Sequence, residues 1–171
     1  MISIVATLLF DITVAANLNK GDKAPNFTLR TIDGKSFKLS DNLMRNTKAI
    51  VLNIWSTNCA PCKAEIPFLV DIDKTYNNKD VIVVGLTLDW NKDQVRSLIR
   101  DLNVTYTIAI DQGGKKIGAD YKIESIPATY VIDQNGIIHS VHGGFPPKNK
   151  DAQKKTVAEI EKSIKELISE K

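Results

Sequence analysis

The feature that most constrains the fold is a run of apolar residues that leads into both cysteines of the chain. The run, Ala49 to Trp55, has almost no polar interruption, which is typical of a strand covered on both faces of a sheet. After Cys59 the apolar residues recur at helical spacing as far as Tyr76. The cysteines therefore lie at a strand-to-helix turn, with Cys59 at the start of the helix and Cys62 one turn inside it.

The cysteine pair is arranged for reversible disulfide chemistry. The Ala60-Pro61 bridge lets the two sulfurs face each other in the first helical turn and keeps the loop small and stiff. The unpaired N–H groups and the dipole of a helix start favour a thiolate, so we expect the pKa of Cys59 to fall below the ~8.5 of an ordinary cysteine. A thiolate is the species that attacks a disulfide. We predict that Cys59 attacks a partner disulfide and that Cys62, the more buried sulfur, resolves the mixed disulfide.

Two other roles fit the cysteine pair less well. A structural disulfide between such near neighbours would restrict the unfolded chain little, and so would stabilise the fold little. A zinc site needs four ligands, and the only histidines, His139 and His142, lie far along the chain with unsuitable spacing. We therefore predict a redox pair that uses no metal and no cofactor.

Length and composition predict a single domain. A chain of 171 residues, 43% hydrophobic and 25% charged, is large enough for one full hydrophobic core. We assign the domain to residues 20–171, because no repeat or low-complexity linker divides them. The net charge of +3 is spread over both halves and forms no basic stripe, so nucleic-acid binding is not expected.

Residues 1–19 form an apolar N-terminal segment with two interpretations. The segment contains Val14-Ala15-Ala16, small residues of the kind that precede a signal-peptide cleavage site. Against this, no lysine or arginine precedes the apolar run and Asp11 interrupts it, which suits an edge strand or helix of the domain. The run is too short to span a membrane as a helix. We expect an export signal that places the protein in the cell envelope or periplasm; the cytoplasm is the alternative.

The remaining elements follow an α/β order. They are a hairpin over 27–31 and 36–39, a buried strand over 81–89, a helix to Leu102 capped by Asn91, a strand over 105–110, a short helix over 113–121, a hairpin over 128–133 and 137–141, and a closing helix that carries Val157 to Ile168. Pro67 lacks an N–H and should kink the first helix rather than end it. A strand–helix–strand order implies parallel neighbours, and the closing hairpin adds antiparallel strands. The sequence predicts a central mixed sheet flanked by helices, with an N-terminal β-hairpin extension.

Several short sequence features accompany this α/β order of elements. They are Gly21 to Phe27 at the entry to the domain, Trp55 four residues before Cys59, Pro67 eight residues after it, and Ser125 to Thr129 before the closing hairpin. In these marks the chain resembles the thioredoxin fold, and more closely its TlpA-like branch, which includes ResA- and CcmG-type thiol–disulfide oxidoreductases. The resemblance covers about residues 20–170. It implies a thioredoxin-like fold and a protein disulfide reductase of the cell envelope.

The resemblance also implies an acidic residue in the site. TlpA-like proteins carry a glutamate three residues after the second cysteine, which matches Glu65, and Asn53 stands where thioredoxin has a buried aspartate. Asn58 replaces a tryptophan of thioredoxins, so docking preference and redox poise should differ from thioredoxin's. If Glu65 points under the site, burial and the thiolate raise its pKa above ~4.3, and it would pass a proton to or from Cys62. Without the resemblance, a solvated surface charge is the usual role of a glutamate.

A cis peptide bond between Ile126 and Pro127, facing the cysteines, is a further implication of the resemblance. The sequence supports it, because an isolated proline that enters a strand cannot donate to the ladder. The alternative is a trans proline at an ordinary strand start. The expected catalytic residues are Cys59, Cys62, Glu65 and Pro127. The residues expected to contact an extended client strand are Trp55, Ala60, Pro61 and Ile126.

Two families that share this fold supply the alternative functions. Peroxiredoxins have the same Ala-Pro-x-Phe opening, but place their cysteine in a Pro-x-x-x-Thr/Ser-x-x-Cys loop. Here Ser56 fits, whereas Leu52 occupies the proline position. Copper chaperones of the Sco type need Cys-x-x-x-Cys and a distant histidine, and the spacing here is one residue short. A thiol peroxidase and a copper-binding chaperone are therefore the alternatives to a reductase.

Partners are also implied by the resemblance alone. It suggests disulfide-containing client proteins, such as apocytochrome c or a similar exported protein, as substrates. A membrane thiol-transfer protein would return electrons to the cysteine pair. We expect the protein itself to be a monomer.

Overall fold

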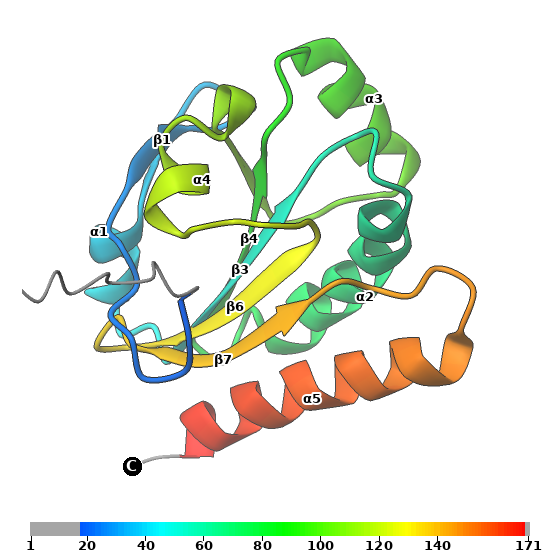
Figure 1. Ribbon diagram of the computed structural model, residues 1–171. Coiled ribbons are helices and arrows are strands. Elements are labelled where there is room, and N and C mark those ends of the chain that lie inside the picture. The colour runs from blue at the N-terminus through cyan, green and yellow to red at the C-terminus, as the bar shows by residue number, and fades with distance from the viewer. Residues whose placement is uncertain (1–17, 170–171) are drawn as a thin grey trace, which may run out of the picture.

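The computed structural model describes residues 18–169 (Figure 1). Residues 1–17, which contain most of the segment predicted as an export signal, lie outside the described residues. Within 18–169, every helix is too short or too polar to cross a lipid bilayer.

A five-stranded mixed sheet forms the centre of the molecule, with the strand order β5-β4-β3-β6-β7 (Figure 1). Its strands are β3 (Ala49–Trp55), β4 (Val81–Thr87), β5 (Thr107–Ile110), β6 (Ala128–Asp133) and β7 (Ile138–Gly143). β3, β4 and β5 run parallel, whereas β6 is antiparallel to β3 and β7 is antiparallel to β6. The predicted mixed sheet is confirmed. Because β6 is antiparallel to β3, its first residue, Ala128, lies opposite Ile54 near the end of β3.

Helices cover both faces of the sheet. On one face α2 (Ala60–Tyr76), α3 (Lys92–Asp101) and α5 (Lys150–Ser169) enclose a core around Val51, Val83 and Val131. On the other face lie α1 (Leu39–Leu43), α4 (Ile117–Asp120) and the N-terminal hairpin, at the left of Figure 1. Since side chains of β3 alternate between the two cores, every residue of this strand is buried, as the apolar run predicts.

The predicted N-terminal hairpin is confirmed as a small separate sheet. β1 (Thr28–Arg30) pairs antiparallel with β2 (Ser36–Lys38), and a bridge from Thr31 to Ala109 joins it to β5. The sequence pattern extends the second strand to Leu39, but the structure begins helix α1 at that residue. Leu39 is buried in the core that Phe27 and Phe37 also line. It is therefore the first residue of a helix that packs on this core, and not the last residue of the strand.

Other boundaries differ from the sequence-based ones for local reasons. β4 ends at Thr87 instead of Asp89, and the Asp89 side chain leaves the sheet to bind the loop after β3. β5 begins at Thr107 instead of Thr105, whose hydroxyl donates to Asp73 of α2. The predicted short helix over 113–121 is a 3-10 turn, η1 (Gln112–Gly114), followed by α4. α2 continues through Pro67 without ending, as predicted.

Candidate active site

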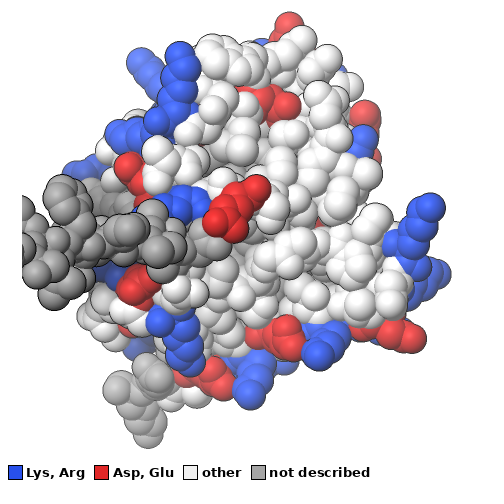
Figure 2. Space-filling view, in the orientation of Figure 1, with Lys and Arg blue, Asp and Glu red and all other residues white. Residues whose placement is uncertain are grey.

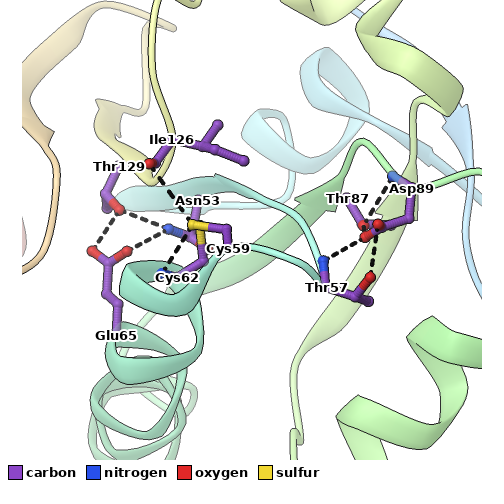
Figure 3. The surroundings of a disulfide bond; sticks show 9 residues. All are labelled: Asn53, Thr57, Cys59, Cys62, Glu65, Thr87, Asp89, Ile126 and Thr129. Carbon is purple, nitrogen blue, oxygen red and sulfur yellow. Dashed lines mark hydrogen bonds between the residues drawn. A yellow bond between two sulfur atoms is a disulfide. The ribbon is translucent and has the colours of Figure 1, made fainter. Parts of the chain in front are cut away.

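The two cysteines lie at the start of α2 and are joined as a disulfide (Figure 3). Their sulfurs are 2.02 Å apart and their Cα atoms 5.2 Å apart. Cys59 caps the helix, and its Sγ accepts the backbone N–H of Cys62 at 3.1 Å. Cys62 is fully buried, while Cys59 is partly exposed. The predicted order of burial is confirmed, and of the two sulfur-bearing side chains Cys59 is the one that solvent can reach.

The chain before β6 lies against the cysteines, as predicted. The Ile126–Pro127 peptide bond is cis, and the carbonyl oxygen of Ile126 lies 3.8 Å from Cys59 Sγ. The two segments are 67 residues apart in sequence. They meet because β6 starts at the edge of the sheet where β3 ends. Ile126 is partly exposed and Pro127 is buried, so Ile126 is the member of the pair with surface open to solvent.

Glu65 lies beneath the cysteines in a closed hydrogen-bond ring (Figure 3). Its carboxylate accepts from the Thr129 hydroxyl at 2.9 Å and from Asn53 Nδ2 at 2.9 Å, and Asn53 also donates to Thr129 Oγ1 at 2.9 Å. The Glu65 residue is only 2% exposed. Burial raises the pKa of Glu65 from 4.5 to about 7, against the lowering effect of the two donors. The predicted upward shift in pKa is confirmed.

The sequence pattern does not identify Thr129 as a partner of Glu65. A usable signal exists, because Asn53 and Thr129 are polar residues in strands that are otherwise apolar and buried, and buried polar groups need partners. The strand register makes Asn53 and Thr129 direct cross-strand neighbours. Their side chains share one face of the sheet, the face that α2 covers.

The prediction that Trp55 contacts a client is wrong. The residue is the last of β3 and is completely buried in the core with Cys62 and Ile66. A side chain without exposed surface cannot contact a client, so its role is to pack beneath the site. Ala60 is exposed and Pro61 partly exposed, so both are accessible from solvent beside Cys59.

A second polar cluster lies on the other side of Cys59, and the sequence pattern does not identify it (Figure 3). The Asp89 carboxylate accepts the backbone N–H and the hydroxyl of Thr57, each at 2.8 Å, and the Thr87 hydroxyl at 2.6 Å. The available signal is an acidic residue two positions beyond the end of a parallel strand, at the same sheet edge as the cysteines.

Histidines play no part in this site. His139 pairs with Glu166 at 2.8 Å, and His142 Nε2 lies 3.0 Å from the Ser140 hydroxyl. Among residues 18–169 no three histidine, cysteine or acidic side chains are grouped to hold a metal ion.

Residues 20–141 match the model of the AhpC/TSA family. The chain belongs to this family of thioredoxin-like proteins. It is 35% identical over 139 residues to the thioredoxin-like protein YneN of Bacillus subtilis, covering 80% of this chain and 79% of YneN. It is 36% identical over 128 residues to the thiol-disulfide oxidoreductase ResA of Oceanobacillus iheyensis, covering 72% of this chain and 65% of ResA.

Solved structures agree with the family assignment. A DsbE-type thiol:disulfide interchange protein of Chlorobium tepidum superposes with a TM-score of 0.77 at 27% identity, covering 89% of this chain and 99% of its own. Peroxidoxin BcpB of Mycobacterium tuberculosis superposes with a TM-score of 0.68 at 18% identity over 85% of this chain and 97% of its own, which shows a shared fold alone. The family match and these relatives together confirm the predicted resemblance to thioredoxin-like thiol–disulfide oxidoreductases of the ResA type.

Proposed function

We propose that this protein is a thiol–disulfide oxidoreductase that reduces disulfides in exported proteins through Cys59 and Cys62. The observation that carries the proposal is the asymmetry of the pair. A partly exposed Cys59 at a helix start lies beside the Ile126–Pro127 segment, and a buried Cys62 lies behind it. One sulfur can meet a client while the other waits to resolve the product.

The reaction consists of two thiol–disulfide exchanges. The Cys59 thiolate attacks one client sulfur, the client S–S bond breaks, and the other client sulfur leaves as a thiolate. Cys62 then loses its proton and attacks Cys59 Sγ, which breaks the mixed disulfide and releases the second client thiolate. Two electrons pass from the protein to the client, two protons end on the client thiols, and Cys59–Cys62 becomes a disulfide. A dithiol donor then reduces the Cys59–Cys62 disulfide by the same two exchanges in the opposite direction.

Glu65 is the proposed proton acceptor for Cys62 in the second exchange. It follows Cys62 by three residues, so both side chains leave the same face of α2 one turn apart. A pKa of about 7 lets this carboxyl take up and release a proton near neutral pH, which suits a general acid and base. No other acidic side chain belongs to the ring formed with Asn53 and Thr129.

The client class is proposed from the relatives. ResA proteins are named thiol-disulfide oxidoreductases, and the Chlorobium tepidum neighbour is named a thiol:disulfide interchange protein. We infer an envelope location, clients such as apocytochrome c, and a membrane thiol-transfer protein as electron donor. Ile126 and the exposed Ala60 would line the contact with an extended client segment.

The test is to trap clients on a Cys62→Ser variant, which cannot resolve the mixed disulfide. Exported proteins with cysteine pairs should accumulate on Cys59, and a Cys59→Ser variant should trap none. Equilibration of the wild type with glutathione should give a potential nearer ~−270 mV than ~−120 mV. A value near the latter would make the protein an oxidase. Rapid consumption of hydrogen peroxide by Cys59 would support a thiol peroxidase instead.

A further inference from the structure

Asp89 connects the end of β4 to the turn that carries Cys59. Its Oδ2 accepts the Thr57 N–H and the Thr87 hydroxyl, and its Oδ1 accepts the Thr57 hydroxyl (Figure 3). Thr57 lies two residues before Cys59. All three groups donate to one carboxylate, and hydrogen bonds to a charged acceptor are the stronger kind.

The turn that Asp89 holds is short and has few other attachments. Cys59 N–H donates to the Ser56 carbonyl at 3.2 Å, which closes the turn on itself. Just before it, the Leu88 N–H donates to the Trp55 carbonyl at 3.0 Å and ends the strand pairing. The two hydrogen bonds that Thr57 donates to Asp89 tie the turn itself to the segment that follows β4.

We propose that Asp89 is a positioning residue that holds Cys59 within reach of Cys62 whenever the disulfide between them is open. In the oxidised protein the S–S bond itself fixes the two sulfurs. In the reduced protein and in the mixed disulfide that bond is absent. The Lys63 N–H still donates to the Cys59 carbonyl at 3.1 Å, and the hydrogen bonds that Thr57 donates to Asp89 hold the turn before Cys59. The inference rests on the proposed function, because it concerns the same two exchanges.

By holding the turn, Asp89 raises the effective concentration of one thiol at the other. A fixed turn has already lost the freedom that closing the disulfide would otherwise remove, so closure is favoured. Without the Asp89 carboxylate the reduced turn explores more conformations, and the Cys59–Cys62 disulfide becomes less favoured. The mixed disulfide is then resolved more slowly by Cys62.

The experiment equilibrates the full chain with reduced and oxidised glutathione. Asp89→Ala removes every acceptor, and we expect the equilibrium constant for forming the Cys59–Cys62 disulfide to fall about tenfold, a potential about 30 mV less negative. The fraction trapped as a mixed disulfide with glutathione should rise. Asp89→Asn keeps one oxygen for the Thr57 N–H and should recover most of the constant. Asp93→Ala is the matched control, since Asp93 is a nearby, highly exposed acid that pairs with Arg96.

An equilibrium constant for Asp89→Ala equal to that of wild type and Asp93→Ala would overturn the proposal. If Asp89→Ala does not fold, Thr57→Val and Thr57→Ser decide the matter, because only valine removes the hydroxyl that donates to Asp89. A lower constant in Thr57→Val than in Thr57→Ser supports the proposal, and equal constants contradict it. Failure of the wild type itself to exchange with glutathione would contradict the proposed function rather than the role of Asp89.

Discussion

The Glu65 carboxyl is strongly buried and accepts hydrogen bonds from two donors, so its charge state affects the stability of the fold. Its pKa is raised by burial to about 7 in the folded protein, from 4.5 in an open chain. The folded state therefore binds this proton more tightly, and the resulting stabilisation is complete below pH 4.5 and is lost as pH rises to about 7. A Glu65→Gln variant cannot titrate and lacks this dependence.

We predict that the unfolding free energy of the wild type, relative to Glu65→Gln, falls by up to about 3 kcal/mol between pH 5 and pH 8. Urea unfolding of both oxidised proteins across this range measures the difference. Because Gln has nearly the same size as Glu, any difference in packing between the two proteins is the same at every pH. Parallel stability curves for the two proteins would show that Glu65 does not titrate near neutral pH.

Thr129, in strand β6, also affects the pKa of Glu65. Its hydroxyl donates to Glu65 Oε1 and lowers the pKa of Glu65, so its loss should raise that pKa further. We predict an upward shift in the titration of Glu65 for Thr129→Val and little change for Thr129→Ser, which keeps the hydroxyl. NMR titration of the Glu65 carboxyl carbon measures it. An unchanged midpoint in Thr129→Val would contradict the hydrogen-bond ring.

At the scale of elements, β4 passes close beneath the site and leaves no room at Gly85. A Cβ added there would lie 2.7 Å from Ile108 Cδ1 and 3.0 Å from both Trp55 Nε1 and Tyr106 Cε2. These three side chains are buried and packed, so making room for the Cβ disturbs the core around them. We predict that Gly85→Ala lowers the unfolding free energy by about 1–3 kcal/mol.

Gly118 supplies the matched control for Gly85. It lies in α4, and a Cβ added there meets no atom within 4 Å. Gly118→Ala should stabilise by about 0.5–1 kcal/mol, because alanine is less flexible when unfolded. Urea unfolding of both variants tests the pair, and equal effects would show that close packing at Gly85 is not the cause.

Local patterns explain which elements could be predicted from the sequence. The apolar run before Cys59, the Asn91 cap that accepts from Asp93 N–H and Gln94 N–H, and Gly136 with its positive φ in the closing hairpin all depend on neighbours in sequence. The contacts of Glu65 with Thr129 and of Asp89 with Thr57 join residues 64 and 32 positions apart. Such contacts follow from strand register, which a periodic pattern does not fix. Trp55 is a different case, because the apolar run that places it in a strand covered on both faces already argues against a position on the docking surface.

For the whole molecule, the charged side chains lie mostly around the rim of the view in Figure 2, and the surface between α2 and β6 is mostly uncharged. Client docking at this surface should therefore depend little on long-range charge. We predict that reduction of a client with a neutral disulfide segment changes by less than about twofold between about 0.05 M and about 0.5 M salt. Stopped-flow reduction assays measure it. A fall of about tenfold would show that charged residues guide the client.

The antiparallel pairing of β6 with β3 also sets the order in which the chain can acquire its site. During synthesis Cys59 and Cys62 emerge long before Pro127, and β3 has no neighbour on that side until β6 arrives. Until then the nascent chain presents both thiols without the Ile126–Pro127 segment that packs beside Cys59 in the folded protein, together with an unpaired apolar strand edge, which is prone to aggregation. A nascent chain that has not yet formed β6 therefore exposes its two thiols before the fold can shield either of them.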